Sequence, residues 1–176
     1  MSKPELAGDL SLFEDAITSN DSAYEELKLG GTSTTTAKIA AQILENLNQG
    51  FYVPNSVERK KLLVAFAERE LTLYGKAFDI IRISGKGRVL ELGDPNRIFN
   101  DLTIYEIKST NKKSVKEDFS RYFFSLSTAE LLTAQNLGIK YRFILVNTLN
   151  GKYLELSLKD LYAKAKGIYP SWSVQF

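Results

Sequence analysis

The segment IYEIKST, residues 104–110, contains the pair of side chains best suited to chemistry. Successive side chains of a strand alternate between the two faces of a sheet, so Glu106 and Lys108 share one face while Tyr105 and Ile107 share the other. A glutamate and a lysine beside an apolar layer are the pattern of an ion pair. They are equally the pattern of a metal ligand next to a cation that can handle a water molecule. The triplet alone is a weak signal, because such triplets occur by chance in many chains.

A second acid, Asp79, lies in the apolar segment AFDIIRIS, residues 77–84, near the start of a predicted strand. Burying a lone carboxylate is costly, so this group must be paired or used. If the two strands are neighbours in one sheet, Asp79 and Glu106 converge on one divalent cation. Mg²⁺ suits such a site, because it prefers oxygen ligands and retains several of its waters.

The composition supports oxygen-based chemistry, because the 176 residues include no cysteine and no histidine. The absence of cysteine excludes disulfides, Fe–S clusters, thiol catalysis and cysteine-bound zinc. The absence of histidine excludes histidine-dependent triads, histidine-bound metals and histidine as a general base. Carboxylates, lysine, tyrosine, hydroxyls and oxygen-bound metals remain, and an Asp-Glu-Lys site with a metal is one of the few hydrolytic designs that need neither residue type.

The net charge of +2 hides an uneven distribution. Residues 1–30 hold seven acids against two lysines, a net charge of −5, which leaves +7 on the rest of the chain. A basic body fits an anionic partner, although a solvated charged surface explains the same pattern. No apolar run approaches the ~18 residues of a membrane span, and the N-terminus lacks the pattern of a signal peptide. We expect a soluble cytoplasmic protein that does not associate with membranes.

The elements that must position these residues follow from periodicity and capping signals. Residues 1–50 are expected to be an irregular, mostly helical extension, with a helix that Asp9 or Ser11 caps and a second helix after the Gly/Thr loop 29–36. That loop lacks the GK[ST] ending of a phosphate-binding loop, so a capping role is favoured over phosphate binding. The remaining predicted helices span residues 56–74, 125–138 and 158–166. The predicted strands span 77–84, 88–94, 102–110 and 141–148, and the segment NGKYLELS, residues 150–157, is expected to contain a turn and one further strand.

The helix over residues 125–138 has a particularly clear start. Ser127 is the expected N-cap and Glu130 stands at the third helical position, as in a capping box, while Gly138 ends the helix. The order of helix, three strands, helix and strand predicts an α/β or α+β fold with a mixed central sheet flanked by helices.

The pieces FDIIRIS, IYEIKST, FSLSTAELLTAQ and YRFILVN, in this order, resemble the PD-(D/E)XK, or restriction-endonuclease-like, nuclease superfamily. Within it they are most similar to the NO VEIN C-terminal-like domain of bacterial restriction systems. The resemblance covers roughly residues 56–150. Phe78 replaces the proline that precedes the first acid in the family motif. We expect a restriction-endonuclease-like domain over residues 51–176 and a helical extension over residues 1–50; the resemblance itself does not extend to residues 1–50 or 151–176.

The resemblance also implies roles for the site residues. Asp79 and Glu106 match the two metal-binding acids, with the carbonyl of Ile107 as a third ligand for Mg²⁺ or Mn²⁺. Lys108 matches the lysine that orients or deprotonates the attacking water and stabilises the transition state. The implied reaction is hydrolysis of DNA phosphodiester bonds to a 5′-phosphate and a 3′-hydroxyl, as in a type II restriction endonuclease. Cutting both strands would favour a homodimer.

Further acids are candidate accessory residues. Glu68 or Glu70 could reach the site from the preceding helix, although a solvated helix face is favoured for both. Asp94 precedes a proline turn, and we favour Asp79 over Asp94 as the first acid. Asp101 is expected at the start of strand 102–110. Glu130 is either only a capping residue or an active-site or DNA-facing one.

The polar connector of residues 111–121 follows the Glu-Ile-Lys strand and is a candidate DNA-binding loop, since cations and hydroxyls usually contact phosphates. An exposed loop with ordinary solvating charges is the alternative. In the C-terminal tail, Tyr169, Trp172 and Phe176 could stack on bases, although packing on the domain or on a dimer partner is favoured. The cations of the connector are Lys112, Lys113, Lys116 and Arg121.

Two other functions remain open from the sequence. The first is a catalytically inactive nucleic-acid-binding or interaction module on the same fold, in which the acids form structural ion pairs. The second is a different reaction, such as small-molecule transfer, with the triplet accidental. Carboxylates of Asp79 and Glu106 that approach one another would favour the nuclease.

Overall fold

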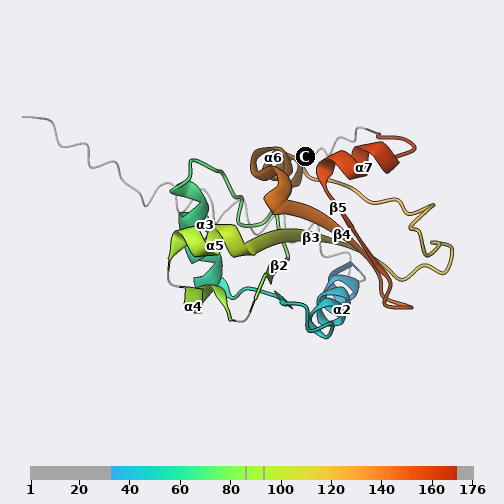
Figure 1. Ribbon diagram of the computed structural model, residues 1–176. Coiled ribbons are helices and arrows are strands. Elements are labelled where there is room, and N and C mark those ends of the chain that lie inside the picture. Colours follow the sequence, from blue (N-terminus) through green and yellow to red (C-terminus); the bar gives the residue numbers. More distant parts are fainter. Residues whose placement is uncertain (1–32, 86, 93, 170–176) are drawn as a thin grey trace, which may run out of the picture. The chain divides into compact units, whose positions relative to one another are not determined.

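The computed structural model describes residues 33–85, 87–92 and 94–169 (Figure 1). The chain divides into two compact units, Met1–Thr35 and Thr36–Phe176, and the second contains the whole sheet. The short helix predicted after Asp9 or Ser11 lies outside the described residues. Helix α2 (Ser33–Glu45) begins the described part of the chain.

Five strands form one mixed sheet in the order β1-β2-β3-β4-β5. Strands β3 and β4 are parallel, and the other neighbouring pairs are antiparallel. The fold is therefore α+β, with a five-stranded mixed sheet flanked by helices, as the sequence predicts. The strands are β1 (Phe51–Tyr52), β2 (Ile80–Ile83), β3 (Leu102–Thr110), β4 (Tyr141–Asn147) and β5 (Tyr153–Leu156).

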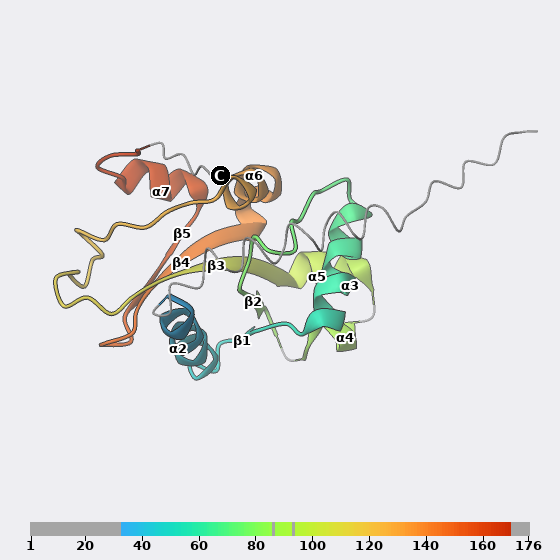
Figure 2. The same cartoon turned by 180° about the vertical axis from the view of Figure 1, so that it is seen from behind.

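Each face of the sheet has its own apolar cluster, because strand side chains alternate. Tyr105 and Ile107 of β3 face the cluster that contains Ala40 and Leu44 of α2. Ile104 of β3 faces the larger cluster, to which helices α3, α6 and α7 contribute. Figures 1 and 2 show α2 on one side of the sheet and α6 and α7 on the other. Glu106 and Lys108 have the parity of Ile104, so they lie on the α3 and α6 face.

Helices α3 (Ser56–Ala67), α6 (Thr128–Leu137) and α7 (Leu158–Lys164) each begin with a complete capping box. For α6 the box consists of Ser127 and Glu130, which confirms the predicted start of this helix. Gly138 follows with a φ of 55° and opens the 3₁₀ turn η1 (Gly138–Lys140), which leads into β4.

Helix α3 is shorter than predicted, because it ends at Ala67 and not near residue 74. Glu70 adopts a left-handed φ of 59°, which reverses the chain after the last turn. Leu71 and Leu73, which look like a continuation of the helical stripe, instead pack on the core from the segment leading to β2.

The predicted strand over residues 88–94 is wrong. The structure forms two short helices there, α4 (Val89–Leu92) and α5 (Pro95–Asp101). β2 is already paired with β1 on one side and with β3 on the other, so no sheet edge is free beside it. Asp94 caps α5 by accepting from the amide of Asn96 at 2.9 Å, and Pro95 suits the first helical turn. Asp101 ends this helix instead of starting β3.

Across the described part of the chain, no helix has the length and apolar character that crossing a membrane requires.

Candidate active site

Asp79 stands immediately before β2, beside the middle of β3. Its amide donates to the carbonyl of Tyr105 at 2.9 Å, and its Oδ2 accepts from the amide of Ile107 at 2.9 Å. The pairing of β2 with β3 ends here, and the Asp79 carboxylate accepts the hydrogen bond of a β3 amide that a backbone carbonyl would otherwise accept. The two acids predicted to lie on neighbouring strands are neighbours in the structure, since β2 pairs with β3.

Glu106 is the most constrained group of the site, with only 3% of its surface exposed. Its Oε1 accepts from the Nζ of Lys108 at 3.0 Å. Its Oε2 is buried without a hydrogen-bond partner in the described structure. Leaving a buried polar atom unsatisfied costs about 1–3 kcal/mol. Such an atom in a native fold points to a missing proton, water or cation.

The electrostatic surroundings of Glu106 oppose its charged form. Burial and the negative charge of Asp79 raise the pKa of Glu106 well above the ordinary range of a carboxyl group, although Lys108 acts in the opposite direction. The antiparallel register that pairs Ile80 with Tyr105 puts Asp79 opposite Glu106, and the bond from the amide of Ile107 holds the Asp79 carboxylate there. Two carboxylates that approach each other inside a protein favour a shared proton or a bound cation.

Lys108 lies between two glutamates on the same face of the sheet. Its Nζ is 3.0 Å from Oε1 of Glu106 and 2.7 Å from Oε2 of Glu130, and 11% of its side chain is exposed. Burial alone would lower the pKa of Lys108, but the charges of both glutamates outweigh burial and raise this pKa. Lys108 is therefore a charged ammonium group in this arrangement, which suits orienting a water or a phosphate better than removing a proton.

Glu130 caps α6, as the capping-box pattern predicts, and also binds Lys108. Its Oε2 accepts from the amide of Ser127 at 3.2 Å, which completes the capping box of α6, and also from Lys108. Burial by itself would raise the pKa of Glu130, but Lys108, a hydrogen bond with the carboxyl of Glu106 and the amide of Ser127 lower it overall. The crossover helix α6 is thereby connected to the lysine of β3.

Sequence reasoning missed two side chains that hold the segment before β2. Arg59 of α3 donates to the carbonyls of Gly75 at 2.9 Å, Phe78 at 3.1 Å and Asp79 at 3.2 Å. Tyr141 of β4 donates from its hydroxyl to the carbonyl of residue 77 at 2.5 Å. These bonds fix the backbone that presents the first acid.

Arg59 could have been found from helical spacing. It precedes Leu62, Leu63 and Phe66 by three, four and seven residues, so it lies on the apolar stripe of α3 and not on its solvated face. Its guanidinium stacks 4.3 Å from the centre of the Phe78 ring. Asp79 and Glu106 both act on its pKa, which burial lowers overall. Arg59 is therefore a third charged group beside the two acids.

A second buried charge of α3, Glu58, serves a different purpose. Arg88 forms two bonds to its carboxylate, at 2.9 and 2.7 Å, and stacks on the ring of Tyr52. The hydroxyl of Tyr52 in turn accepts from the amide of Val89 at 2.8 Å. This group fixes α4 against α3 and β1.

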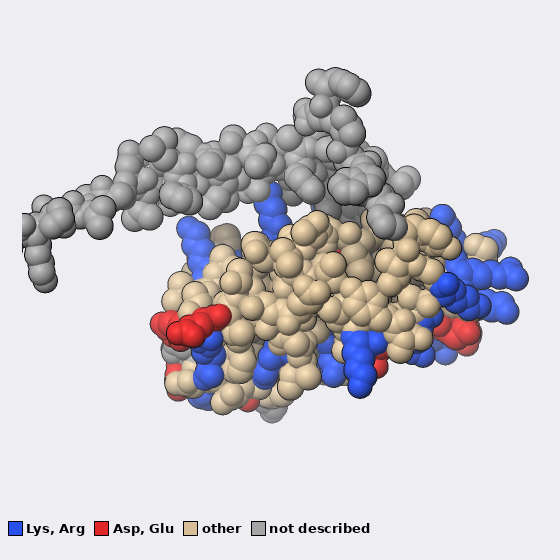
Figure 3. Space-filling view, turned by 90° about the horizontal axis from the view of Figure 1, so that it is seen from above, with Lys and Arg blue, Asp and Glu red and all other residues tan. Residues whose placement is uncertain are grey.

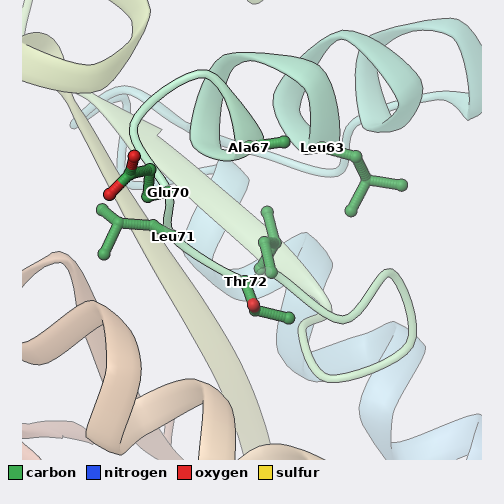
Figure 4. A pocket seen from close by; sticks show the side chains of 6 residues that line it. Leu63, Ala67, Glu70, Leu71 and Thr72 are labelled. Atoms are coloured by element: carbon green, nitrogen blue, oxygen red, sulfur yellow. The ribbon is translucent and has the colours of Figure 1, made fainter.

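The other predicted acids lie elsewhere. Glu68 is exposed at the end of α3, and Asp94 caps α5. Glu70 lines an open pocket of about 450 Å³ with Leu63 and Ala67 of α3 (Figure 4). Across residues 33–85, 87–92 and 94–169, no hydrogen bond or ion pair joins these acids to Asp79 or Glu106.

A metal at this site would need waters or backbone oxygens to complete its coordination. Within the described residues, no group of three or more Asp, Glu, His or Cys side chains is arranged to hold a metal ion. The unsatisfied Oε2 of Glu106 and the nearby carboxylate of Asp79 nevertheless offer the oxygen donors that Mg²⁺ and Mn²⁺ accept. Because Mg²⁺ usually retains several waters, two carboxylates fit it.

The connector between β3 and α6 contains no helix or strand, as predicted. Figure 3 shows Lys and Arg side chains gathered at the end of the molecule where Figure 1 places this connector and α7. Of the tail aromatics, Tyr169 is 74% exposed, while Trp172 and Phe176 lie outside the described residues. All four predicted DNA-binding cations of the connector are exposed: Lys112, Lys113, Lys116 and Arg121.

Comparison with protein-family models, with curated proteins and with solved structures found no match to this chain. The chemistry of Asp79, Glu106, Lys108 and Glu130 is therefore the basis for assigning a function.

Proposed function

We propose that the chain is a metal-dependent endodeoxyribonuclease of the type II restriction kind, with a restriction-endonuclease-like fold. The observation that carries this proposal is Glu106. It is buried, it leaves one oxygen without a partner, and it lies beside Asp79 and Lys108.

The arrangement of the elements supports the proposed fold. Antiparallel β1, β2 and β3 are followed by the crossover helix α6 and by β4, which is parallel to β3. This is the order of elements that the resemblance implies. In this order the acid before β2, Asp79, lies beside Glu106 and Lys108 of β3. Asp79, Glu106 and the backbone of Ile107 would hold Mg²⁺ or Mn²⁺ there.

The bound metal would lower the pKa of a coordinated water and neutralise charge that develops on the scissile phosphate. The chain's own part is to position these groups. Arg59 and Tyr141 fix the backbone that carries Asp79, and the amide of Ile107 orients its carboxylate. Glu130 holds the ammonium group of Lys108, which in its charged form orients the attacking water and stabilises the negative charge of the phosphate.

The exposed cations of the connector directly follow the strand of the site, and they would contact the DNA backbone without reading sequence. A homodimer with two such sites would cut both strands.

The test is cleavage of supercoiled and linear DNA in the presence of Mg²⁺. We expect the wild type to cut and Lys108→Ala to cut at least about 100-fold more slowly, the range of a lost acid–base or electrostatic group. Lys60→Ala removes an exposed lysine of α3 and should cut like the wild type. If the wild type binds DNA and cuts none of the substrates offered, the nuclease proposal is wrong.

One observation favours a second candidate, a non-catalytic nucleic-acid-binding module. Lys108 is bonded to Glu106 and Glu130 at once, and such a network also occurs as a purely structural ion pair. This candidate predicts DNA binding that is insensitive to metal, with no cleavage by any variant.

A further inference from the structure

Residues 121–127, which join the connector to α6, form an extended segment whose side chains alternate between packed and exposed positions. Tyr122, Phe124 and Leu126 pack against the larger apolar cluster. Arg121 and Phe123 lie on the opposite, exposed side, because the side chains of an extended chain alternate. With 78% of its surface exposed, Phe123 is one of the two most exposed large apolar residues among those described.

The segment is held firmly in place. The hydroxyl of Tyr122 donates to the carbonyl of Ser109 at 2.7 Å, and its ring packs 5.3 Å from that of Phe124. Phe119 and Arg121 have left-handed φ values of 60° and 66°. Non-glycine residues keep such strained conformations only where their surroundings dictate them. Phe123 is therefore held towards solvent by a defined local structure.

Each end of this segment forms a hydrogen bond with a residue that adjoins or binds Lys108. Ser109, which accepts from Tyr122, directly follows Lys108 in β3. At the other end, Ser127 donates to Glu130, which binds the ammonium group of Lys108. Because four residues of extended chain span at most about 14 Å, Phe123 lies within that distance of Ser127.

We propose that Phe123 is a stacking platform for an unpaired base of a single-stranded DNA segment that enters the candidate site. This inference rests on the proposed DNA-cleaving function and adds unpaired DNA segments to the substrates that the site would accept. An exposed aromatic ring among cations is the combination with which proteins bind single strands, since bases stack on the ring and phosphates meet the cations. The connector carries four cations against Glu117 and Asp118. Asp118 is already engaged, because it accepts from the amide of Ser120 at 3.0 Å.

Duplex DNA offers no comparable fit to the ring, because its bases are stacked on one another. The platform should therefore favour single-stranded ends, gaps or distorted segments over intact duplex. Neighbouring Arg121 would contact the phosphate of the same strand.

The test measures binding of the full chain, in EDTA, to fluorescently labelled oligothymidylate and to a duplex of equal length. We expect Phe123→Ala to weaken binding of the single strand by roughly fivefold to a hundredfold, and to leave duplex binding unchanged. The control Ile139→Ala, at a residue of η1 that is 80% exposed, should bind both like the wild type. In a Trp172→Phe background, Phe123→Trp should retain binding, and oligothymidylate should quench its fluorescence.

Equal binding of the single strand by Phe123→Ala and wild type would overturn the stacking role, and so would failure of the wild type to bind it. A change of oligomeric state in Phe123→Ala without a change in binding would assign the ring to a protein interface instead. The cleavage test is separate. Metal-dependent cutting by the wild type together with unchanged binding by Phe123→Ala refutes only the platform, whereas selective single-strand binding without any cutting refutes only the nuclease.

Discussion

At the scale of single residues, the site is a set of charges that the fold does not fully balance. Glu106 and Glu130 are both buried, and one ammonium group, that of Lys108, binds both. Asp79 adds a further negative charge near Glu106. When Glu106 is ionised, three carboxylates face only two cations among the described residues, the ammonium group of Lys108 and the guanidinium of Arg59, and a divalent cation would be favoured in this region of low dielectric constant.

The raised pKa of Glu106 gives a prediction for the metal-free protein. Glu106 keeps its proton in the folded chain at pH values where the unfolded chain has lost it, so the free energy of unfolding falls as the pH rises. The stabilisation is complete below the ordinary pKa of glutamate and is lost towards the raised pKa. Asp79, Lys108 and Glu130 face this carboxyl and remain in every variant compared.

We expect the free energy of unfolding of the wild type, measured by urea denaturation in EDTA, to fall with pH relative to that of Glu106→Gln. The difference should exceed about 1.4 kcal/mol, the equivalent of one pKa unit. Glu117→Gln, which neutralises an exposed glutamate of the connector, should follow the wild type. Parallel curves for wild type and Glu106→Gln would show that Glu106 is ionised in the folded protein.

The sequence was sufficient to predict the pair on β3 and the neighbouring acid before β2. Strand alternation places Glu106 and Lys108 on one face whatever the rest of the chain does. The partners from distant elements were harder to predict. The spacing of Arg59 places it on the buried stripe of α3 but does not show which carbonyls it reaches, and the bond of Tyr141 depends on how β4 lies beside the segment before β2.

At the scale of elements, the capping box of α6 connects local helix formation with the site. Glu130 accepts from the amide of Ser127 and from Lys108 through the same oxygen. The start of the helix therefore fixes the position of the lysine. α7 begins with a capping box of the same kind, Ser157 with Asp160, whose bonds involve no site residue.

The capping serines of α6 and α7 allow the effect of a cap on stability to be separated from its effect on the site. Ser127→Ala and Ser157→Ala should each lower the free energy of unfolding by about 1 kcal/mol, the usual cost of losing an N-cap. Only Ser127→Ala should also lower kcat for DNA cleavage, because only α6 positions Lys108. Urea denaturation and cleavage rates measure the two effects. An equal loss of kcat in both variants would mean that stability alone governs activity.

Local signals predicted the elements well where the chain had no alternative partner. The capping residues of α6 and the β-branched runs of β2, β3 and β4 specify these elements directly. The segment 88–94 also has strand-like composition, yet it forms α4 and the cap of α5. Sheet edges are a property of the whole fold, and the sequence does not show that β2 is paired on both sides.

At the scale of the whole molecule, charge is distributed unevenly. Residues 1–30 carry a net charge of −5, and the remainder carries +7. Cations gather near the connector that follows the strand of the site (Figure 3). Such a field raises the rate at which an anionic polymer meets the site, and its effect declines as salt screens it.

The connector cations should therefore contribute to affinity without contributing to base specificity. Replacing Lys112 and Lys113 by alanine should weaken binding to all DNA sequences alike. It should also reduce the slope of log K against log salt concentration by about 0.9 for each lost duplex phosphate contact. Fluorescence anisotropy over a series of salt concentrations measures both effects, and Lys60→Ala is the control. An unchanged slope would remove the connector from the DNA interface.

The most direct test of the central claim, that Asp79 and Glu106 form a metal-dependent nuclease site, is the rate of plasmid cleavage as a function of Mg²⁺ concentration. For the wild type we expect a rate that rises with Mg²⁺, saturates and is abolished by EDTA. Glu106→Gln should be slower by at least about 100-fold at every Mg²⁺ concentration. A wild type without Mg²⁺-dependent cleavage, or a Glu106→Gln variant that cuts at the wild-type rate, would contradict the claim.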